Sequence, residues 1–358
     1  MLGIQLRQPF LAMSAVALLW LGPGIADASV SYPGLYEAEV VMEQDTQARR
    51  AAAFSEAMGI VLVRLTGRLD AASSPETRDL RRSAERYVQQ FRTTREGKLW
   101  VAFDGATLGE ALAELGLPIW GAERPTVLLV LAIDQGGGKR FVLTPEDEVP
   151  DPDPDTAGLR DRIEELSDLR GVPIVMPLMD AQDRSVISFT EVWGGFDQAL
   201  LDAGDRYRTD SVLLGRLQAG AADRIRWTLY DQDQSYRWTG NLDAGIHQAS
   251  DRFAQRYSVT TGAAVQGEIG LRVNGVDSLE EYARVFKYLE ALTAVREVFL
   301  RQLEDETAEF GMSLIGSVEN VDRAIRLGGM LQSEGPVMLD PDASGGARPV
   351  MLSYRLIR

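Results

Sequence analysis

The sequence predicts a mixed α/β and α+β protein built from three successive units. A continuous apolar run at 127–133 predicts a strand that is buried on both faces of a sheet. Helical stripes of apolar residues alternate with short strands along the chain, and after residue 268 they follow the order β-α-β-β-α-β. We therefore expect a small N-terminal α+β unit at 29–120, a central α/β sheet with added antiparallel strands at 125–261, and a C-terminal ferredoxin-like unit at 268–358.

Residues 1–28 have the three parts of a secretory signal peptide. Arg7 supplies a positive charge, residues 10–21 are almost wholly apolar, and small residues at 26–28 precede a cleavage point at Ser29. A membrane anchor is the alternative interpretation, but a spanning helix needs about 20 apolar residues. We expect cleavage before Ser29, export to the periplasm, and no stable membrane insertion of the mature chain.

In the first unit the expected order of elements is β-α-α-β-α. Apolar residues from Phe54 to Leu65 recur at helical spacing, and Gly67 ends that helix. Ser74 and Pro75 have the N-cap and first-turn chemistry of a second helix, whose apolar face extends to Phe91. The remaining predicted elements are strands at 36–42 and 99–103 and a helix at 108–115.

In the second unit, three glycines at 136–138 separate the buried strand from a strand at 140–143, which predicts a hairpin. Strands that alternate with helices farther along imply a largely α/β sheet. The predicted elements are helices at 159–170 and 196–207, strands at 174–176 and 212–217, and an antiparallel pair at 225–230 and 236–242.

In the third unit, Ile269, Leu271 and Val273 alternate as on a half-buried strand. Ser278 and Glu281 match a capping box at the start of a helix. The other predicted elements are strands at 298–303 and 310–314, a helix that starts at 318 and ends at the glycines 328–329, and a strand at 352–356.

The composition excludes several classes of function. The chain has 37 Lys+Arg against 53 Asp+Glu, a net charge of −16, and no cluster of basic residues in its sequence. Phosphate backbones and anionic membrane surfaces repel such a chain, so we expect no nucleic-acid partner. The absence of cysteine excludes disulfides, thiolate catalysis and a lipid-modified N-terminal cysteine.

His247 is the one histidine of the chain, so a Ser-His-Asp triad would have to use it. Ile246, Ser250 and Phe253 follow helical spacing around it. This pattern favours an ordinary position beside the buried stripe of a helix. Zinc sites of the usual His/Cys type are excluded as well.

Two stretches could be mistaken for ligand sites. Residues 136–139 lack the Ser or Thr and the following helix that a P-loop requires, so they favour a hairpin turn. Asp151, Asp153 and Asp155 alternate with prolines and lack the glycine and the distal Glu of an EF-hand loop. We expect a solvated loop there, with no metal and no cofactor.

Carboxylates are the acid–base groups that remain in number. Asp134 follows the buried strand, Asp180 follows the strand at 174–176, and Glu191 lies farther along. The carboxyl ends of strands line the ligand crevice of open α/β sheets, and a carboxylate pair there could hydrolyse a glycoside. Acidic residues at strand ends are also common in turns and helix caps, which is the interpretation that we favour.

The stretch Glu191-Val-Trp-Gly-Gly-Phe is predicted as a loop. An aromatic residue flanked by glycines is typical of a binding surface, or of a plug that closes a core. Arg206 lies close in sequence to Asp210, so an internal pair between arginine and carboxylate is an obvious structural use. The candidate binding residues are Trp193, Phe196, Asp134, Asp180, Glu191 and Arg206.

Five stretches carry a family resemblance: LVRLTGR at 62–68, GVPIVMPLMD at 171–180, VWGGF at 192–196, RYRTDSVLLGRL at 206–217 and SLEEYARVFKYL at 278–289. As a set they resemble the bacterial family called domain of unknown function 2066, over nearly all of the chain after the signal peptide. The resemblance implies a protein of Gram-negative bacteria, with no established activity and no catalytic residues to assign. The order of elements in the central unit is also similar to the periplasmic domains of penicillin-binding-protein activators.

These observations favour an exported, non-catalytic periplasmic protein that binds another protein of the cell envelope. The stretch at 192–196 and the ferredoxin-like unit are its expected contacts. The alternative is a carboxylate-based hydrolase acting on cell-wall polysaccharide. A carrier of a small ligand is a third class, and it would require a deep apolar pocket.

Overall fold

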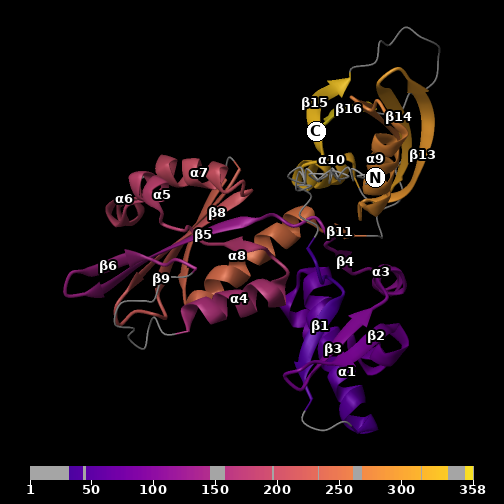
Figure 1. Ribbon diagram of the computed structural model, residues 1–358. Coiled ribbons are helices and arrows are strands. Elements are labelled where there is room, and N and C mark those ends of the chain that lie inside the picture. The colour runs from indigo at the N-terminus through magenta and orange to yellow at the C-terminus, as the bar shows by residue number, and fades with distance from the viewer. Residues whose placement is uncertain are drawn as a thin grey trace, which may run out of the picture.

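The computed structural model describes residues 32–42, 46–145, 158–195, 197–232, 234–260, 268–315, 317–337 and 351–357. The predicted signal peptide, the loop at 151–155 and Phe196 lie outside these residues. The expected mixture of helices and sheets is confirmed, and Figure 1 shows it as three bodies along the chain. Over the described residues, no helix has the length and apolar character that a membrane span requires.

The N-terminal unit packs one long helix against a small antiparallel sheet. Helix α1 (Gln47–Thr66) begins at Thr46, whose side chain accepts the Arg49 N–H, and it ends at Gly67 in the left-handed conformation. Its apolar face forms one core with the sheet and with α3 (Gly105–Glu114). The sheet order is β1 (Glu37–Val41), β3 (Lys98–Phe103) and β2 (Val88–Thr93).

The predicted second helix, from Ser74 to Phe91, is wrong. Its last part is the strand β2, which pairs with β3, and the Phe91 ring is half exposed and meets Phe54 edge-on at 5.3 Å. Pairing with β3 outweighs the helical period because valine, phenylalanine and threonine fit a pleated surface. The preceding residues form three short turns of helix, η1 (Leu69–Ala72), α2 (Arg78–Arg82) and η2 (Ala84–Tyr87).

The central sheet has a parallel middle and antiparallel additions, as predicted. Its strands follow the order β10-β9-β8-β5-β6, and β7 pairs with the start of β5. β5 (Val127–Gly136) runs parallel to β8 (Ser211–Gln218) and to the short β7 (Ile174–Val175). The antiparallel strands are β6 (Lys139–Val142), β9 (Ile225–Asp231) and β10 (Gln234–Gly240).

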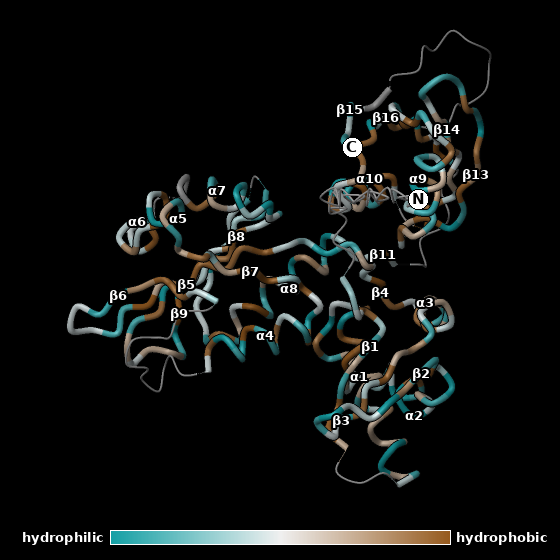
Figure 2. Tube along the Cα trace, viewed as in Figure 1, coloured by the Kyte–Doolittle hydropathy of each residue, from teal (hydrophilic) through white to brown (hydrophobic). Residues whose placement is uncertain are grey.

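Helices cover both faces of this sheet (Figure 1). α4 (Leu159–Arg170) and α8 (Leu242–Tyr257) pack on one face, over Leu129 and Leu131. The other face, with Leu128 and Val130, lies under α5 (Ala181–Val186), α6 (Phe189–Gly194) and α7 (Asp197–Arg206). β5 is therefore buried on both sides, which explains its uninterrupted apolar run, brown in Figure 2.

The C-terminal unit contains the predicted β-α-β-β-α-β order with one additional strand. β12 (Glu268–Asn274), β13 (Val295–Glu304) and β14 (Thr307–Leu314) share a core with α9 (Leu279–Ala291) and α10 (Val318–Gly328). The additional strand, β15 (Leu331–Val337), follows α10 in the chain and pairs antiparallel with β16 (Met351–Leu356) at the edge of the sheet. β16 in turn pairs parallel with β12. β15 contains Ser, Glu, Gly and Pro, so no alternation indicated it.

A short ladder connects the N-terminal segment with the end of the central unit. β4 (Pro118–Ile119) pairs antiparallel with β11 (Val259–Thr260), which directly follows α8. The end of α8 also contacts the C-terminal unit, where the Arg323 guanidinium donates to the Arg256 carbonyl at 2.5 Å. α8 is thus the element at which all three units meet (Figure 1).

Candidate functional site

Asp134 closes the hairpin between β5 and β6. Its carboxylate accepts the Gly136 N–H at 2.9 Å and the Arg140 Nε–H at 2.9 Å. The Gly136 N–H, and then Arg140, hold the pKa of Asp134 below its usual range. This carboxylate therefore stays ionised, and its two hydrogen bonds stabilise the hairpin turn.

Asp180 and Arg206 form an ion pair that connects the start of α5 to the end of α7. Asp180 is the N-cap of α5 and accepts the N–H groups of Gln182 and Asp183, while Arg206 lies 2.7 Å from its second oxygen. Arg206 first, and then the backbone N–H groups, lower the pKa of Asp180 to about 2. Arg206 also pairs with buried Asp183, which accepts the Tyr207 hydroxyl at 2.6 Å. Arg206 thus forms internal pairs with Asp180 and Asp183, whereas Asp210, its neighbour in sequence, accepts the Thr126 N–H instead.

The stretch at 191–196 was predicted as a loop, and that prediction is wrong up to residue 194. Ser188 and Glu191 form a capping box that starts α6, and Gly195 ends this helix in the left-handed conformation. Glu191 thus accepts the Ser188 N–H at 3.1 Å. The capping box at Ser188 starts the helix despite the two glycines, because Gly194 is its last residue and Gly195 is its C-cap.

Trp193 projects from α6 as a half-buried side chain. Its ring stacks on Phe189 with centroids 5.0 Å apart, and the Arg226 guanidinium lies 5.4 Å from its centroid. It packs against the core beneath α5–α7 and is also exposed at its margin. The position of Trp193 is therefore compatible with both predicted roles: its ring closes the core beneath α5–α7, and its exposed margin can form part of a contact surface.

The structure gives the predicted carboxylates separate local tasks. Asp134 serves a hairpin, while Asp180 and Glu191 each cap a different helix. The cavities described in the structure contain none of the three. A glycosidase needs two carboxylates roughly 5–10 Å apart in a cleft, and no observation on these residues supports one. Within the described residues, no three His, Asp or Glu side chains are grouped so that they could hold a metal ion.

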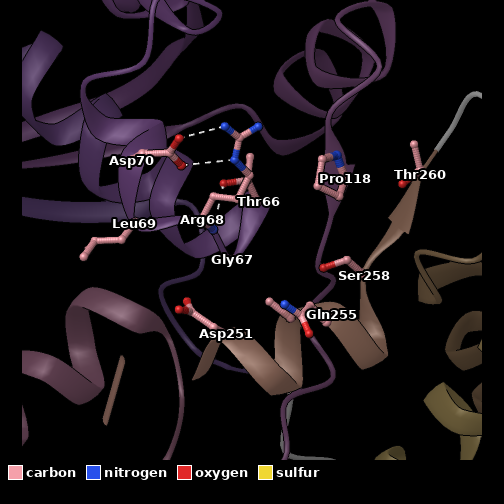
Figure 3. Close-up of a pocket in the computed structure, with 11 residues that line it drawn as sticks. Thr66, Gly67, Arg68, Leu69, Asp70, Pro118, Asp251, Gln255, Ser258 and Thr260 are labelled. Carbon is pink, nitrogen blue, oxygen red and sulfur yellow. Dashed lines mark hydrogen bonds and ion pairs between the residues drawn. The ribbon is translucent and has the colours of Figure 1, made fainter. Parts of the chain in front are cut away.

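A cavity of about 580 Å³ lies where the N-terminal unit meets α8 and the β4–β11 ladder (Figure 3). We call it the junction cavity. It lies between elements far apart in sequence, and ligand sites often lie at such junctions. Its lining residues are Thr66, Gly67, Arg68, Leu69, Asp70, Pro118, Asp251, Ala254, Gln255, Ser258 and Thr260.

The end of α1 shapes one wall of the junction cavity. Gly67 has a φ of 65°, and a Cβ at this position would lie 2.2 Å from the Ala254 Cβ on α8. Only glycine permits both this conformation and this close approach. The Thr66 hydroxyl donates to the Leu62 carbonyl and accepts the Arg68 N–H, which turns the chain toward the cavity.

The Arg68 guanidinium is held in place on this wall. Figure 3 shows its two bonds to Asp70, of 3.1 and 2.8 Å, and Glu76 accepts a third at 3.1 Å. The bond to Arg68 is the main cause that keeps the pKa of Asp70 below its usual range. Three of the five N–H donors of this arginine are thereby engaged.

A fully buried arginine, Arg170, lies behind the junction cavity. Its Nη2 donates to the Gly67 carbonyl at 2.8 Å and to Asp251 at 2.5 Å. Half of the Asp251 side chain remains exposed. Arg170 thus fixes both a backbone carbonyl of α1 and a carboxylate of α8 at the cavity wall.

Two further buried arginines connect the N-terminal and central units. Arg64 bonds the Asp168 carbonyl at 2.6 Å, and Arg124 bonds the Arg64 carbonyl at 2.9 Å. Arg124 also lies 3.8 Å above the Trp120 ring, and burial lowers its pKa to about 9. These bonds make the cavity wall rigid, because each buried cation is held by carbonyl oxygens from different elements.

The remaining lining supplies neutral polar groups and small apolar surfaces. Gln255 and Thr260 are exposed in the cavity, and the Ser258 hydroxyl is buried without a hydrogen-bond partner among the described residues. Leu69, Pro118 and Ala254 lie beside them. The lining contains no histidine, and its two carboxylates, Asp70 and Asp251, are bonded to Arg68 and Arg170.

The sequence analysis missed this cavity and its arginines. Arg64 interrupts an otherwise apolar helical stripe, and Arg170 stands directly before the helix-ending Gly171. A cation in an apolar stripe is a usable signal, because such a residue must find acceptors inside the fold. The acceptors themselves are backbone carbonyls, which no sequence pattern reveals.

A family model described as a domain of unknown function (DUF8605) matches residues 29–121. This match shows an uncharacterised domain over the N-terminal unit, and it does not establish the resemblance to domain of unknown function 2066. The match ends just before Arg124, whose guanidinium bonds back to α1. No curated protein and no solved structure matches the chain.

Proposed function

We propose that this protein is an exported, non-catalytic binding protein of the periplasm, and that the junction cavity is its binding site. One observation carries the proposal: a cavity of about 580 Å³ at the meeting point of two units, lined by polar side chains that include the Ser258 hydroxyl, which has no hydrogen-bond partner in the part of the chain that the structure describes. The predicted signal peptide supports the periplasmic address. The separate local tasks of Asp134, Asp180 and Glu191 leave the hydrolase alternative without support.

The chemistry of the lining favours a peptide-like ligand. The Gln255 amide and the hydroxyls of Ser258 and Thr260 match the N–H and C=O groups of a polypeptide. Leu69 and Pro118 offer a place for a small apolar side chain. A segment of another envelope protein has this combination of groups, so we infer an adaptor role.

Site-specific crosslinking in cells tests this proposal. A photoreactive amino acid placed at Gln255 should capture a discrete partner, whereas the same probe at Glu290, exposed on α9, should not. Adding Thr260→Trp to the Gln255 probe should abolish the capture by filling the cavity. Identical products from the two probe positions, or capture that survives Thr260→Trp, would refute the cavity as the site.

The proposed export to the periplasm and the cleavage before Ser29 have a separate test. Osmotic-shock fractionation should release a chain whose N-terminal residue, determined by mass spectrometry, is Ser29. An intact chain beginning at Met1 in the cytosol of growing cells would refute export.

A further inference from the structure

Arginine side chains gather on one face of the central sheet, in a chain whose net charge is −16. Arg216 on β8 lies directly opposite Arg226 on β9, and Arg237 on β10 is diagonal to Arg226. The neighbouring Leu214 and Tyr230 pack beneath α5–α7, so the two-residue period of a strand places these arginines on that same face. Like charges directly opposite on a sheet repel each other, so this face attracts groups of negative charge.

Arg226 and Arg237 are the accessible members of this group. Both are exposed, and among the described residues neither is paired with a carboxylate. The Arg216 guanidinium is bound to the backbone of α6, since its Nε donates to the Val192 carbonyl at 2.8 Å. Arg226 and Arg237 thus present their guanidinium groups to solvent from diagonal positions on adjacent strands, which place their Cα atoms about 7–8 Å apart.

The aromatic pair on α6 orients one end of this group. Arg226 lies 5.4 Å from the Trp193 ring centroid, and Trp193 is itself stacked on Phe189. A guanidinium over a ring keeps its N–H donors in its own plane, directed outward. Because the Trp193 ring is already in contact with Phe189 and Arg226, it serves to position Arg226 rather than to stack on a sugar or a base.

Strand β10 adds a second recognition element. It pairs with β9 on one side and is the terminal strand of the described sheet. Ser235 and Thr239 flank Arg237 on the same face, and all three are exposed. An edge strand can accept a further strand through its free N–H and C=O groups.

The charge and spacing indicate what this surface binds. Side chains two residues apart on an extended strand point the same way and lie about 6.6–6.8 Å apart, and Arg226 lies opposite Thr239, two residues along β10 from Arg237. A nucleic acid or an anionic membrane would bring its charge against the whole acidic body. A short acidic peptide would meet the arginines alone.

We propose that β10, Arg226 and Arg237 form a docking surface for an extended acidic segment of a partner protein. The segment adds a strand to the edge of β10 and directs two of its carboxylates at the arginines. This surface is separate from the junction cavity and does not depend on it. Trp193 acts as a positioning residue for Arg226.

Fluorescence anisotropy with synthetic peptides tests the proposal on the mature chain. The probe is a labelled peptide of alternating glutamate and threonine, and the matched probe carries glutamine in place of glutamate. At low salt the glutamate peptide should bind about 5- to 30-fold more tightly, because two charged contacts contribute about 0.5–1 kcal/mol each. Equal binding of the two peptides, or no binding of either, would overturn the proposal.

Variants locate the site. The double variant Arg226→Glu with Arg237→Glu should weaken glutamate-peptide binding at least about tenfold. Arg284→Glu with Arg296→Glu makes the same charge change at exposed positions of the C-terminal unit and should leave binding unchanged. Equal loss in both variants would show a non-specific charge effect and overturn the assignment, as would binding to phosphatidylglycerol vesicles in preference to the peptide.

Discussion

Replacing Gly67 by alanine tests the close contact that forms the junction cavity. Gly67 and Gly116 both have a φ of 65°, so an alanine at either position incurs the same left-handed backbone strain of about 1–2 kcal/mol. At Gly116 an added Cβ has no other atom within 4 Å. At Gly67 it lies 2.2 Å from the Ala254 Cβ and 3.1 Å from the Trp120 ring.

The two positions therefore separate backbone strain from overpacking. Overpacking in a buried contact costs about 1–3 kcal/mol, so Gly67→Ala should destabilise the protein by about 2–5 kcal/mol and Gly116→Ala by about 1–2. The assay is urea unfolding followed by tryptophan fluorescence, to which the fully buried Trp120 contributes. A Gly67→Ala variant no less stable than Gly116→Ala would refute the reasoning.

A second-site change sharpens this test. Ala254→Gly removes the carbon atom with which the new methyl group collides, at a cost of about 1 kcal/mol for glycine within a helix. The double variant should therefore be more stable than the sum of the two single changes predicts, by about 1 kcal/mol or more. Strict additivity would show that the cost at Gly67 arises elsewhere.

Three further predictions concern charged groups. Because Arg206 lowers the pKa of Asp180 to about 2, its ionised form stabilises the fold above the unfolded pKa of about 3.9, and this contribution is lost as the pH falls from about 3.9 to about 2. Asp180→Asn should therefore lower the urea midpoint at pH 7, and the difference from the wild type should begin to shrink below about pH 4 and disappear near pH 2. Burial, and then Arg170, lower the pKa of His247 in the folded chain, so the free energy of unfolding should decline as the pH falls below about 6.5. His247→Gln should make the free energy of unfolding depend less on pH in the same urea assay. The same pH dependence in this variant and in the wild type would contradict the prediction. Arg124→Met leaves three carbonyl oxygens without their donor, and a loss of about 2–3 kcal/mol in urea unfolding is expected, whereas an unchanged midpoint would exclude a stabilising role.

Much of the fold could be predicted from local patterns. The buried strand β5, the glycine that ends α1 and the hairpin after Asp134 all occur where the sequence indicates them. β2 and β15 could not be predicted, because their strand character depends on β3 and β16, which lie elsewhere in the chain.

The candidate sites were less predictable than the fold. Trp193 and Arg206 were singled out from sequence, and the structure stacks Trp193 on Phe189 and pairs Arg206 with Asp180, neither of which the sequence indicated as a partner. The junction cavity joins residues near 67 with residues near 255, and no local signal relates these stretches. A contact between side chains distant in sequence leaves no period in either stretch.

Local sequence is enough to establish which segments are apolar, where several helices begin and end, and that the whole chain is acidic. These properties depend on neighbouring residues, through periodicity, capping and composition. Two groupings of arginines become visible in three dimensions alone: Arg226 and Arg237 share one exposed face, and Arg64, Arg124 and Arg170 meet at one junction. No basic cluster exists along the chain because these arginines are widely spaced in it; strand pairing and helix packing bring them together in space.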